Sequence, residues 1–414
     1  MTTPEHPIPA LRVETTACRE FGSLLALLDE SEPLLWMRRG FGMAGVGTAL
    51  RLEFTGPNRI ADAAAAWQRV VAAASIVDPV ALPGTGLIAL GTFAFSEHSA
   101  LTSVLVVPAT IIGRTGGQSW ITRIAEGDLA PLVVPPSRPL GADARVHLAS
   151  GALSAAAYLD AVGTAVTSIR NHELSKVVLA RELTGRLPAG ADLRSAIGTL
   201  ALGYPDCWTF AIDGFIGSSP ETLVGVTGGS VTARVLAGSA ARGTDAASDQ
   251  DAATALATSA KDLDEHQYAV QSVLGSLRPH SPTVMASELP FTLKLPNLWH
   301  LASDVEGTLV DGSTALDLVG ALHPTAAVAG TPTALALALI ERLEPFDRGR
   351  YAGPVGWVGA NGDGEWAVAV RSAQVAPNGD VTAYAGAGIV GDSVPERELV
   401  ETRLKFRPVV EAFG

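Results

Sequence analysis

The chain has 414 residues, of which 47% are hydrophobic and only 17% are charged, so it can bury a large globular core. Its formal net charge of −13 argues against nucleic acid or an anionic membrane as the main partner, although a local cationic cluster could still bind an anionic small molecule. No apolar run long enough to cross a membrane and no secretion signal is indicated. The two cysteines, Cys18 and Cys207, lie far apart, so neither a disulfide framework nor a metal knuckle is indicated. We therefore expect a cytoplasmic protein.

Residues 1–150 show strand-like runs separated by Gly and Pro turns, with one Ala-rich helical stretch over Ala61–Ala74. Residues that could carry chemistry are sparse there and dense in 151–414. Because strands and helices occur in both parts with no linker between them, the pattern predicts a single α/β (α+β) domain. Residues 1–150 would form its N-terminal part, and 151–414 would form the catalytic region.

The expected elements after residue 150 follow one another closely. They are helices over 153–171, 249–277, 313–322 and 332–343, strands over 207–216, 222–227, 230–237 and 381–389, a hairpin over 351–375, and a last helix from Pro395. The turn of the hairpin is indicated by Asn361-Gly-Asp-Gly. The first of these helices leads into an apolar, strand-like run, Ser175–Arg181.

Lys176 lies in that apolar run, and it is one of only four lysines among 29 basic residues. Arginine serves as the surface cation elsewhere in the chain. A desolvated ammonium can lose its proton and act as a base, whereas a guanidinium effectively never does. Lys176 is therefore either a buried base or a strand-edge lysine whose amine reaches water.

Carboxylates in three further segments could carry chemistry. Glu221 follows a turn, at the start of a strand, where a solvated glutamate is common. Asp262 and Glu265 share one face of a predicted helix, and Glu398 and Glu401 share a face of the last helix. Each pair alone is typical of a solvated helix face, but two such faces could meet around Mg²⁺, which prefers oxygen ligands.

A cation and a run of glycines complete the candidates. Arg371 ends an apolar strand, where it could bind a carboxylate ligand or pair with an internal acid. The segment Tyr384–Gly391 is a glycine-ended strand whose backbone N–H groups could approach an anion. It does not match a dinucleotide-binding fingerprint.

Over about residues 155–412 the motifs together resemble those of the chorismate-utilising enzymes, most closely the isochorismate synthases. In order they are KVVLAR from Lys176, SSPE from Ser218, LAGSAARG from Leu236, DLDEH from Asp262, HLASDVEG from His300, LHPTAAVAG from Leu322, PFDRGRYAGPVGW from Pro345, YAGAGIV from Tyr384 and ELVETRLK from Glu398. The resemblance implies one large domain with a β-sandwich core flanked by helices. It also implies chorismate as the small-molecule substrate.

The resemblance assigns roles to individual residues. Lys176 matches the base that activates water for attack at C2 of chorismate, and Glu221 matches the acid that protonates the departing C4 hydroxyl. The expected Mg²⁺ ligands are Glu265 and Glu401, with Asp262 and Glu398 beside them. The expected substrate-binding positions are Gly238, Ser239, His300, Ala327, Tyr351, Arg371, Gly386, Gly388 and Lys405.

Three positions bear on the choice within the family. Ammonia-using members typically carry Gln where Lys176 stands, and aminodeoxychorismate synthases carry a nucleophilic Lys where this chain has Ala237. Both positions indicate water as the nucleophile, so no glutamine amidotransferase subunit is expected. Salicylate synthases typically carry Thr at the position of Ala327. The resemblance thus favours an isochorismate synthase of the menaquinone or siderophore type, with a salicylate synthase or a catalytically silent chorismate-binding relative as alternatives.

Overall fold

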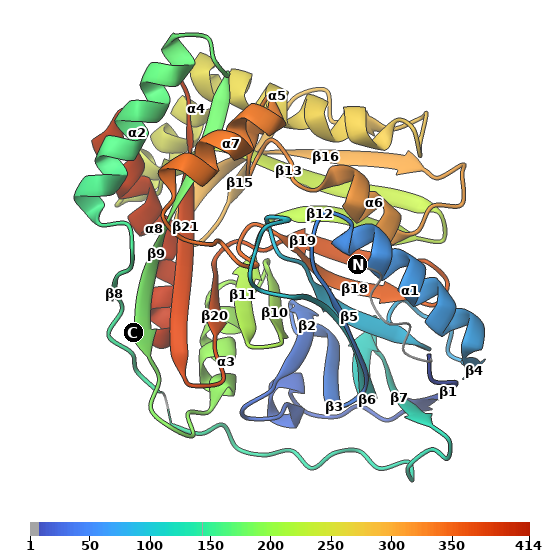
Figure 1. Cartoon of the computed structure of the whole chain (residues 1–414). Coiled ribbons are helices and arrows are strands. Elements are labelled where there is room, and N and C mark those ends of the chain that lie inside the picture. Colours follow the sequence, from blue (N-terminus) through green and yellow to red (C-terminus); the bar gives the residue numbers. More distant parts are fainter. Residues whose placement is uncertain (1–7, 143) are drawn as a thin grey trace.

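The structure is a computed structural model that describes residues 8–142 and 144–414. All 21 strands in the described part belong to one hydrogen-bonded network, and all pairs are antiparallel except β1–β4. The strands before residue 151 are β1 (Leu11–Cys18), β2 (Leu34–Arg38), β3 (Phe41–Phe54), β4 (Ser75–Val77), β5 (Ile88–Thr92), β6 (Ser103–Thr115), β7 (Gln118–Glu126) and β8 (Ala149–Ser150). Strands β1–β7 lie together in one part of the molecule, whereas β8 lies beside β9 (Figure 1).

The later strands continue the same network. They are β9 (Lys176–Arg186), β10 (Trp208–Ile212), β11 (Phe215–Ser219), β12 (Thr222–Thr227), β13 (Ser230–Ala241), β14 (Met285–Ala286), β15 (Phe291–Lys294), β16 (Leu298–Thr308), β17 (Gly330–Thr331), β18 (Pro354–Gly359), β19 (Gly364–Val368), β20 (Ser372–Val375) and β21 (Asp380–Ile389). Strand β2 pairs with β10, and β5 pairs with β18. The early and late parts of the chain therefore share one sheet network.

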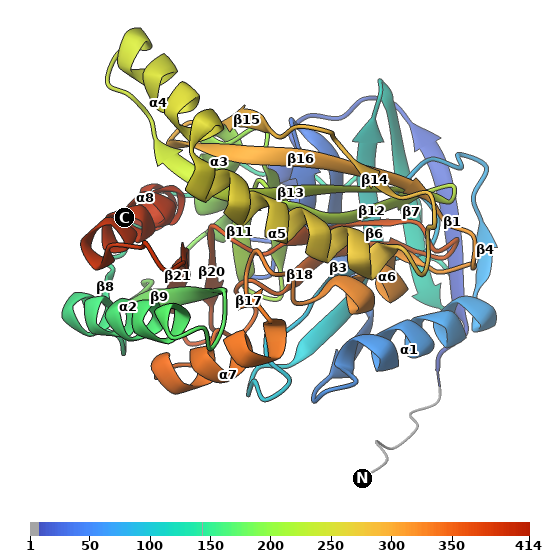
Figure 2. The same cartoon turned by 90° about the horizontal axis from the view of Figure 1, so that it is seen from above.

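Eight α-helices are described, and a short 3₁₀ turn spans Leu24–Leu27. They are α1 (Arg59–Ala73), α2 (Ala155–Arg170), α3 (Leu193–Gly203), α4 (Ala246–Thr258), α5 (Ala260–Leu277), α6 (Ala315–Leu322), α7 (Thr333–Leu343) and α8 (Pro395–Phe413). Helices α2, α7 and α8 flank β9 and β21, while α4 and α5 lie along β13 and β16 (Figure 2). The predicted α/β fold class is confirmed.

Two of the predicted elements were wrong in detail. The helix expected over 249–277 is two helices, because Ser259 ends α4 and its side chain accepts a hydrogen bond from the Asp262 N–H of α5. The strand expected over 207–216 is the hairpin of β10 and β11. Its turn, Asp213-Gly214, has positive φ at both residues, which suits a tight hairpin turn.

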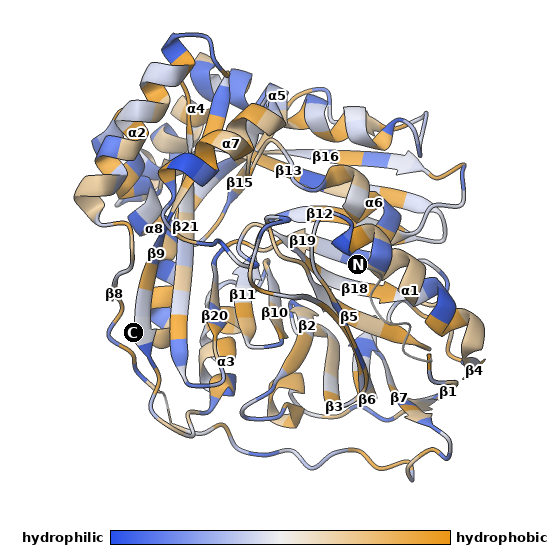
Figure 3. Ribbon diagram, viewed as in Figure 1, coloured by the Kyte–Doolittle hydropathy of each residue, from blue (hydrophilic) through white to orange (hydrophobic). Residues whose placement is uncertain are grey.

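Figure 3 shows hydrophobic residues interspersed with hydrophilic ones along the strands and helices. The main core joins distant segments, since Trp67 of α1 packs in the same cluster as Trp357 and Trp366 of the β18–β19 hairpin. No helix in the described residues is long and apolar enough to cross a membrane.

The sheet places the functional strands side by side. β9 pairs with β21 in a register that sets Val178 opposite Gly388 and Ala180 opposite Gly386. Helix α8 packs on β21, and α5 packs on β13. The acidic residues of α5 and α8 and Lys176 of β9 line one cavity.

Candidate active site

A cavity of about 420 Å³ contains every residue that the sequence analysis placed in a site. Its walls come from β9, β13, α5, β16, β21, α8 and the segments around residues 221, 327, 351 and 371. The predicted residues that line it are Lys176, Glu221, Gly238, Ser239, Asp262, Glu265, His300, Ala327, Tyr351, Arg371, Gly386, Gly388, Glu398, Glu401 and Lys405. The structure therefore brings together residues spread over 230 positions of sequence, while their individual roles stay predictions.

Lys176 is the first residue of β9, and its side chain is buried in the cavity with 2% of its area exposed. Its Nζ lies 2.8 Å from Oε1 of Glu265 on α5. Both groups are largely shielded from solvent. Burial raises the pKa of the Glu265 carboxyl, but the positive charge of Lys176 opposes this effect and holds that pKa below its usual value. A side chain at Gly388 would meet this pair, because its Cβ would lie 2.7 Å from Glu265 Oε1.

Glu221 lies two residues after the end of β11, and its carboxyl group is buried. Desolvation raises its pKa to about 7, against the opposing charges of Arg371, Lys176 and Lys405. Burial thus lets this carboxyl keep its proton to a higher pH than an exposed glutamate, as a general acid requires. The sequence analysis placed this residue in the site by resemblance; the burial that makes it an acid comes only from the fold.

Arg371 is a buried guanidinium with positive φ, between β19 and β20. It forms no ion pair with any described acid, and its Nη2 donates to Nε2 of His300 at 3.1 Å. Because that ring nitrogen accepts, Nδ1 of His300 carries the proton and donates to the Gly238 carbonyl at 3.2 Å. Burial, aided by Arg371, holds the His300 pKa well below its usual value, so the ring is neutral. The alternative of an internal ion pair for Arg371 is thus not realised, and its remaining donors suit a carboxylate ligand.

The acidic groups of the two helices crowd one wall of the cavity. Desolvation and then Glu401 raise the Glu398 pKa to about 7, and desolvation and the neighbouring Glu265 and Glu401 raise that of Asp262. Glu401 is bound by Lys405 at 2.5 Å and accepts from the Ser239 hydroxyl at 3.0 Å. Four carboxylates with unfavourable mutual charge are a donor set that suits a divalent cation.

As they stand, no three acidic, His or Cys side chains in the described part of the chain are grouped closely enough to hold a metal ion. Glu265 forms an ion pair with Lys176, and Glu401 forms one with Lys405. A bound cation would have to compete with these two ammonium groups for the carboxylates. The carboxylates fit a metal as oxygen donors, and ligation would need side-chain rearrangement.

The remaining predicted positions form the other walls. The Tyr351 ring stacks on Tyr384 with centroids 5.3 Å apart, and burial raises its pKa to about 12, so its hydroxyl stays a neutral donor. Lys405 donates to the Gly386 carbonyl at 3.0 Å. Gly238 has φ +81°, a conformation that strongly favours glycine.

Two lining cations were missed by the sequence analysis as site residues. Lys261 and Arg397 both contribute to the cavity and are both exposed to solvent. Lys261 belongs to the small set of lysines, which was an available signal. Nothing in the local sequence distinguishes Arg397 from an ordinary surface arginine.

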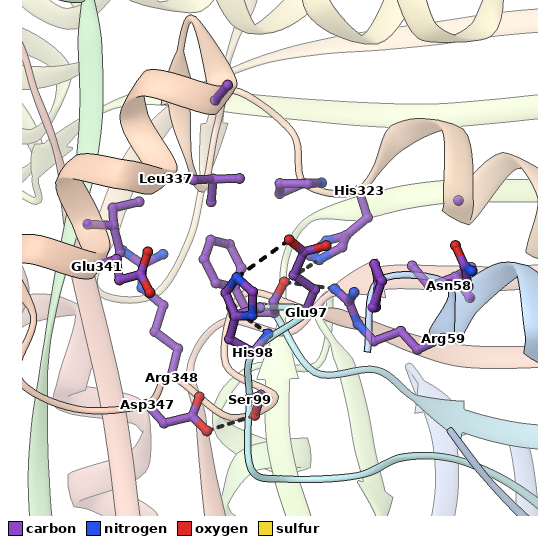
Figure 4. Close-up of a pocket in the computed structure, with 18 of the residues that line it drawn as sticks. Asn58, Arg59, Glu97, His98, Ser99, His323, Leu337, Glu341, Asp347 and Arg348 are labelled. Atoms are coloured by element: carbon purple, nitrogen blue, oxygen red, sulfur yellow. Dashed lines mark hydrogen bonds and ion pairs between the residues drawn. The ribbon is translucent and has the colours of Figure 1, made fainter. Parts of the chain in front are cut away.

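A second cavity, of about 1200 Å³, lies between α1, α6 and α7 and holds none of the predicted site residues (Figure 4). Its buried cations already have partners. Arg348 pairs with Glu344 at 2.6 Å, and Arg59 donates to the carbonyls of Ala94 and Phe95. Asp347 accepts from the Ser99 hydroxyl. Despite its larger volume, this cavity offers no buried charge free to bind a ligand.

Comparison with known proteins identifies the family of the chain. The family described as chorismate binding enzyme matches residues 15–126 and 136–414. The chain is 42% identical to the isochorismate synthase DhbC of Bacillus subtilis, over 62% of this chain and 67% of that protein. It is 37% identical to the putative isochorismate synthase MenF of Mycobacterium tuberculosis, over 67% and 79% of the two chains. A crystal structure of the putative 2,3-dihydroxybenzoate-specific isochorismate synthase DhbC from Bacillus anthracis aligns with a TM-score of 0.77 at 30% identity, over 94% of this chain and 98% of that one.

Proposed function

The chain belongs to the family of chorismate-binding enzymes, and from that premise we propose that it is a Mg²⁺-dependent isochorismate synthase. Relatives named isochorismate synthase support the reaction. The observation that carries the proposal is the shared cavity that holds a buried amine, Lys176, an acid whose pKa is raised by burial, Glu221, and an unpaired guanidinium, Arg371.

In the proposed reaction the neutral amine of Lys176 takes a proton from a water molecule as its oxygen bonds to C2 of chorismate. The ring double bonds shift, the C4–O bond breaks, and Glu221 gives its proton to the departing hydroxyl, which leaves as water. One water enters and one leaves, so the reaction is an isomerisation. General acid and base groups of this kind typically contribute about 10²- to 10⁴-fold each.

Arg371 and Tyr351 would hold the enolpyruvyl carboxylate of the substrate. Arg371 supports this role because its guanidinium is buried without an acidic partner, and such a charge is costly unless an anion joins it. His300 holds the guanidinium from one side and leaves its other donors available. Fixing the ring in this way supplies orientation, which is a major part of catalysis.

Asp262, Glu265, Glu398 and Glu401 would hold Mg²⁺. When bound, the ion would neutralise the ring carboxylate of the substrate and orient the ring. The amine of Lys176 is occupied by Glu265 in this structure, so its action as a base requires Glu265 to be engaged elsewhere, as a metal ligand would be.

Product identity tests the proposal. Purified protein is incubated with chorismate and Mg²⁺, and the products are followed by NMR. Isochorismate alone is the expected result, whereas salicylate with pyruvate would show the salicylate synthase reaction. Ala327, where salicylate synthases typically carry Thr, lines this cavity. Chorismate binding without turnover would show a silent relative and contradict the proposal.

A further inference from the structure

Four exposed residues form the mouth of the candidate active site. They are Lys261, Asp392, Val394 and Arg397, whereas the other lining residues are buried or half-buried. Lys261 is near the start of α5, and the other three lie at the start of α8 or just before it. A ligand that comes from solvent therefore passes between the first turns of these two helices.

The two cations at this mouth, Lys261 and Arg397, make few contacts with other polar side chains in the described residues. The Arg397 side chain makes no hydrogen bond or ion pair within the described residues, while Lys261 lies 4.0 Å from Glu398, at the outer limit of an ion pair. The Lys261 side chain is 41% exposed. An exposed contact at that distance adds little to stability, and Arg397 makes no such contact, so neither cation is explained by a structural role.

The charge balance of the cavity depends on these two residues. Five cations and six carboxyl groups line it, and inside it Lys176 and Lys405 are already paired with Glu265 and Glu401. Without the two mouth cations, three cations would face six carboxyl groups. Such a cavity, in a chain with net charge −13, would repel an anion before it reached Arg371.

From this arrangement we infer that Lys261 and Arg397 capture the anionic substrate at the mouth of the cavity and set the rate and affinity of its entry. The inference rests on the proposed function, because chorismate carries two carboxylates and is a dianion near neutral pH. Both residues act before the chemical step. They are therefore determinants of substrate capture and not catalytic residues.

Arg397 gives the cleaner test, because Lys261 also neighbours the predicted metal ligand Glu398. For Arg397→Gln at low ionic strength we expect kcat/KM for chorismate to fall about fivefold, with kcat changed less than about twofold, as steering charges act on encounter. Because exposed charges are screened within about 8 Å at physiological salt and within about 3 Å at 1 M, the loss should shrink as NaCl is added. Arg397→Lys should keep most of the wild-type kcat/KM, and Lys261→Gln combined with Arg397→Gln should lower it further.

The matched control is Arg342→Gln on α7, which removes an exposed arginine that lines neither cavity. This variant makes the same change in net charge and should leave kcat/KM and its salt dependence unchanged. A second readout is the chorismate dissociation constant in a Lys176→Arg background, measured by calorimetry with Mg²⁺ present. There Arg397→Gln should weaken binding in a salt-dependent way.

Several outcomes would overturn the inference while leaving the proposed function intact. They are an unchanged kcat/KM for Arg397→Gln, a loss that salt does not reduce, a fall in kcat at constant KM, or an equal loss for Arg342→Gln. If instead the wild-type protein does not turn over chorismate, the proposed function is wrong, and the inference about capture falls with it.

Discussion

The two cavities of this protein differ in how their charges are satisfied. The larger one, between α1, α6 and α7, is lined by cations whose hydrogen bonds go to the protein itself, as in the Arg348–Glu344 pair. The smaller one holds Arg371 without an acidic partner and Glu221 with a pKa of about 7. Unsatisfied buried charge costs folding free energy, so it marks a place where a ligand is expected to complete the structure. Volume alone would have selected the other cavity.

Replacing the buried amine of Lys176 should cost the most activity. Lys176→Arg keeps a positive charge but removes the titratable base, so we expect turnover to fall by about 1,000-fold or more, with the fold intact. Steady-state assays and circular dichroism would measure the two effects. Substantial remaining turnover would show that another group activates the water.

The acid comes next in expected effect. Glu221→Gln preserves size but cannot protonate a leaving hydroxyl, and we expect kcat to fall by about 100-fold or more. The matched control is Glu341→Gln in the larger cavity, where we expect kcat/KM to stay within about twofold because an exposed glutamate there touches nothing that reacts. A similar loss in both variants would remove the distinction between the cavities.

The predicted metal site can be probed by another replacement of glutamate with glutamine. Glu265→Gln should weaken the Mg²⁺ dependence, raising the half-saturating concentration by about tenfold or more, since one charged oxygen ligand is lost. A Mg²⁺ titration of initial rates would measure this. An unchanged titration would exclude Glu265 from the ligand set.

The pH dependence sharpens the assignment of Glu221. Because burial raises its pKa to about 7, the reactive protonated form is lost as pH rises through that value. The reaction also needs a neutral Lys176 amine, so we expect the slope of log kcat/KM against pH to fall by about one unit as pH passes 7, and Glu221→Gln should abolish this bend. Glu398 also has a pKa of about 7, so the profile should be repeated at several Mg²⁺ concentrations. A limb that moves with Mg²⁺ would be due to the metal site and would contradict the assignment to Glu221.

Local patterns account for much that the sequence predicted correctly. The i, i+3 spacing of Asp262 with Glu265, and of Glu398 with Glu401, placed each pair on one helix face, because a helix repeats every 3.6 residues. The apolar run around Lys176 indicated a buried strand, and the structure has one. The Asp213-Gly214 turn was also readable from its residues but was overlooked, which merged β10 and β11 into one strand.

Short-range periodicity and ordered motifs thus specified most of the elements, the family and most of the residues that line the cavity, although they missed Lys261 and Arg397. Which charges are satisfied depends on how the fold arranges distant segments. The fold pairs Lys176 with Glu265 and leaves Arg371 without an acidic partner. It also buries Glu221 away from water and places Arg397 at the mouth of the cavity. The physical reason is that pKa shifts and ion pairs depend on distances between segments far apart in the chain, and on exclusion of water, which no local spacing specifies.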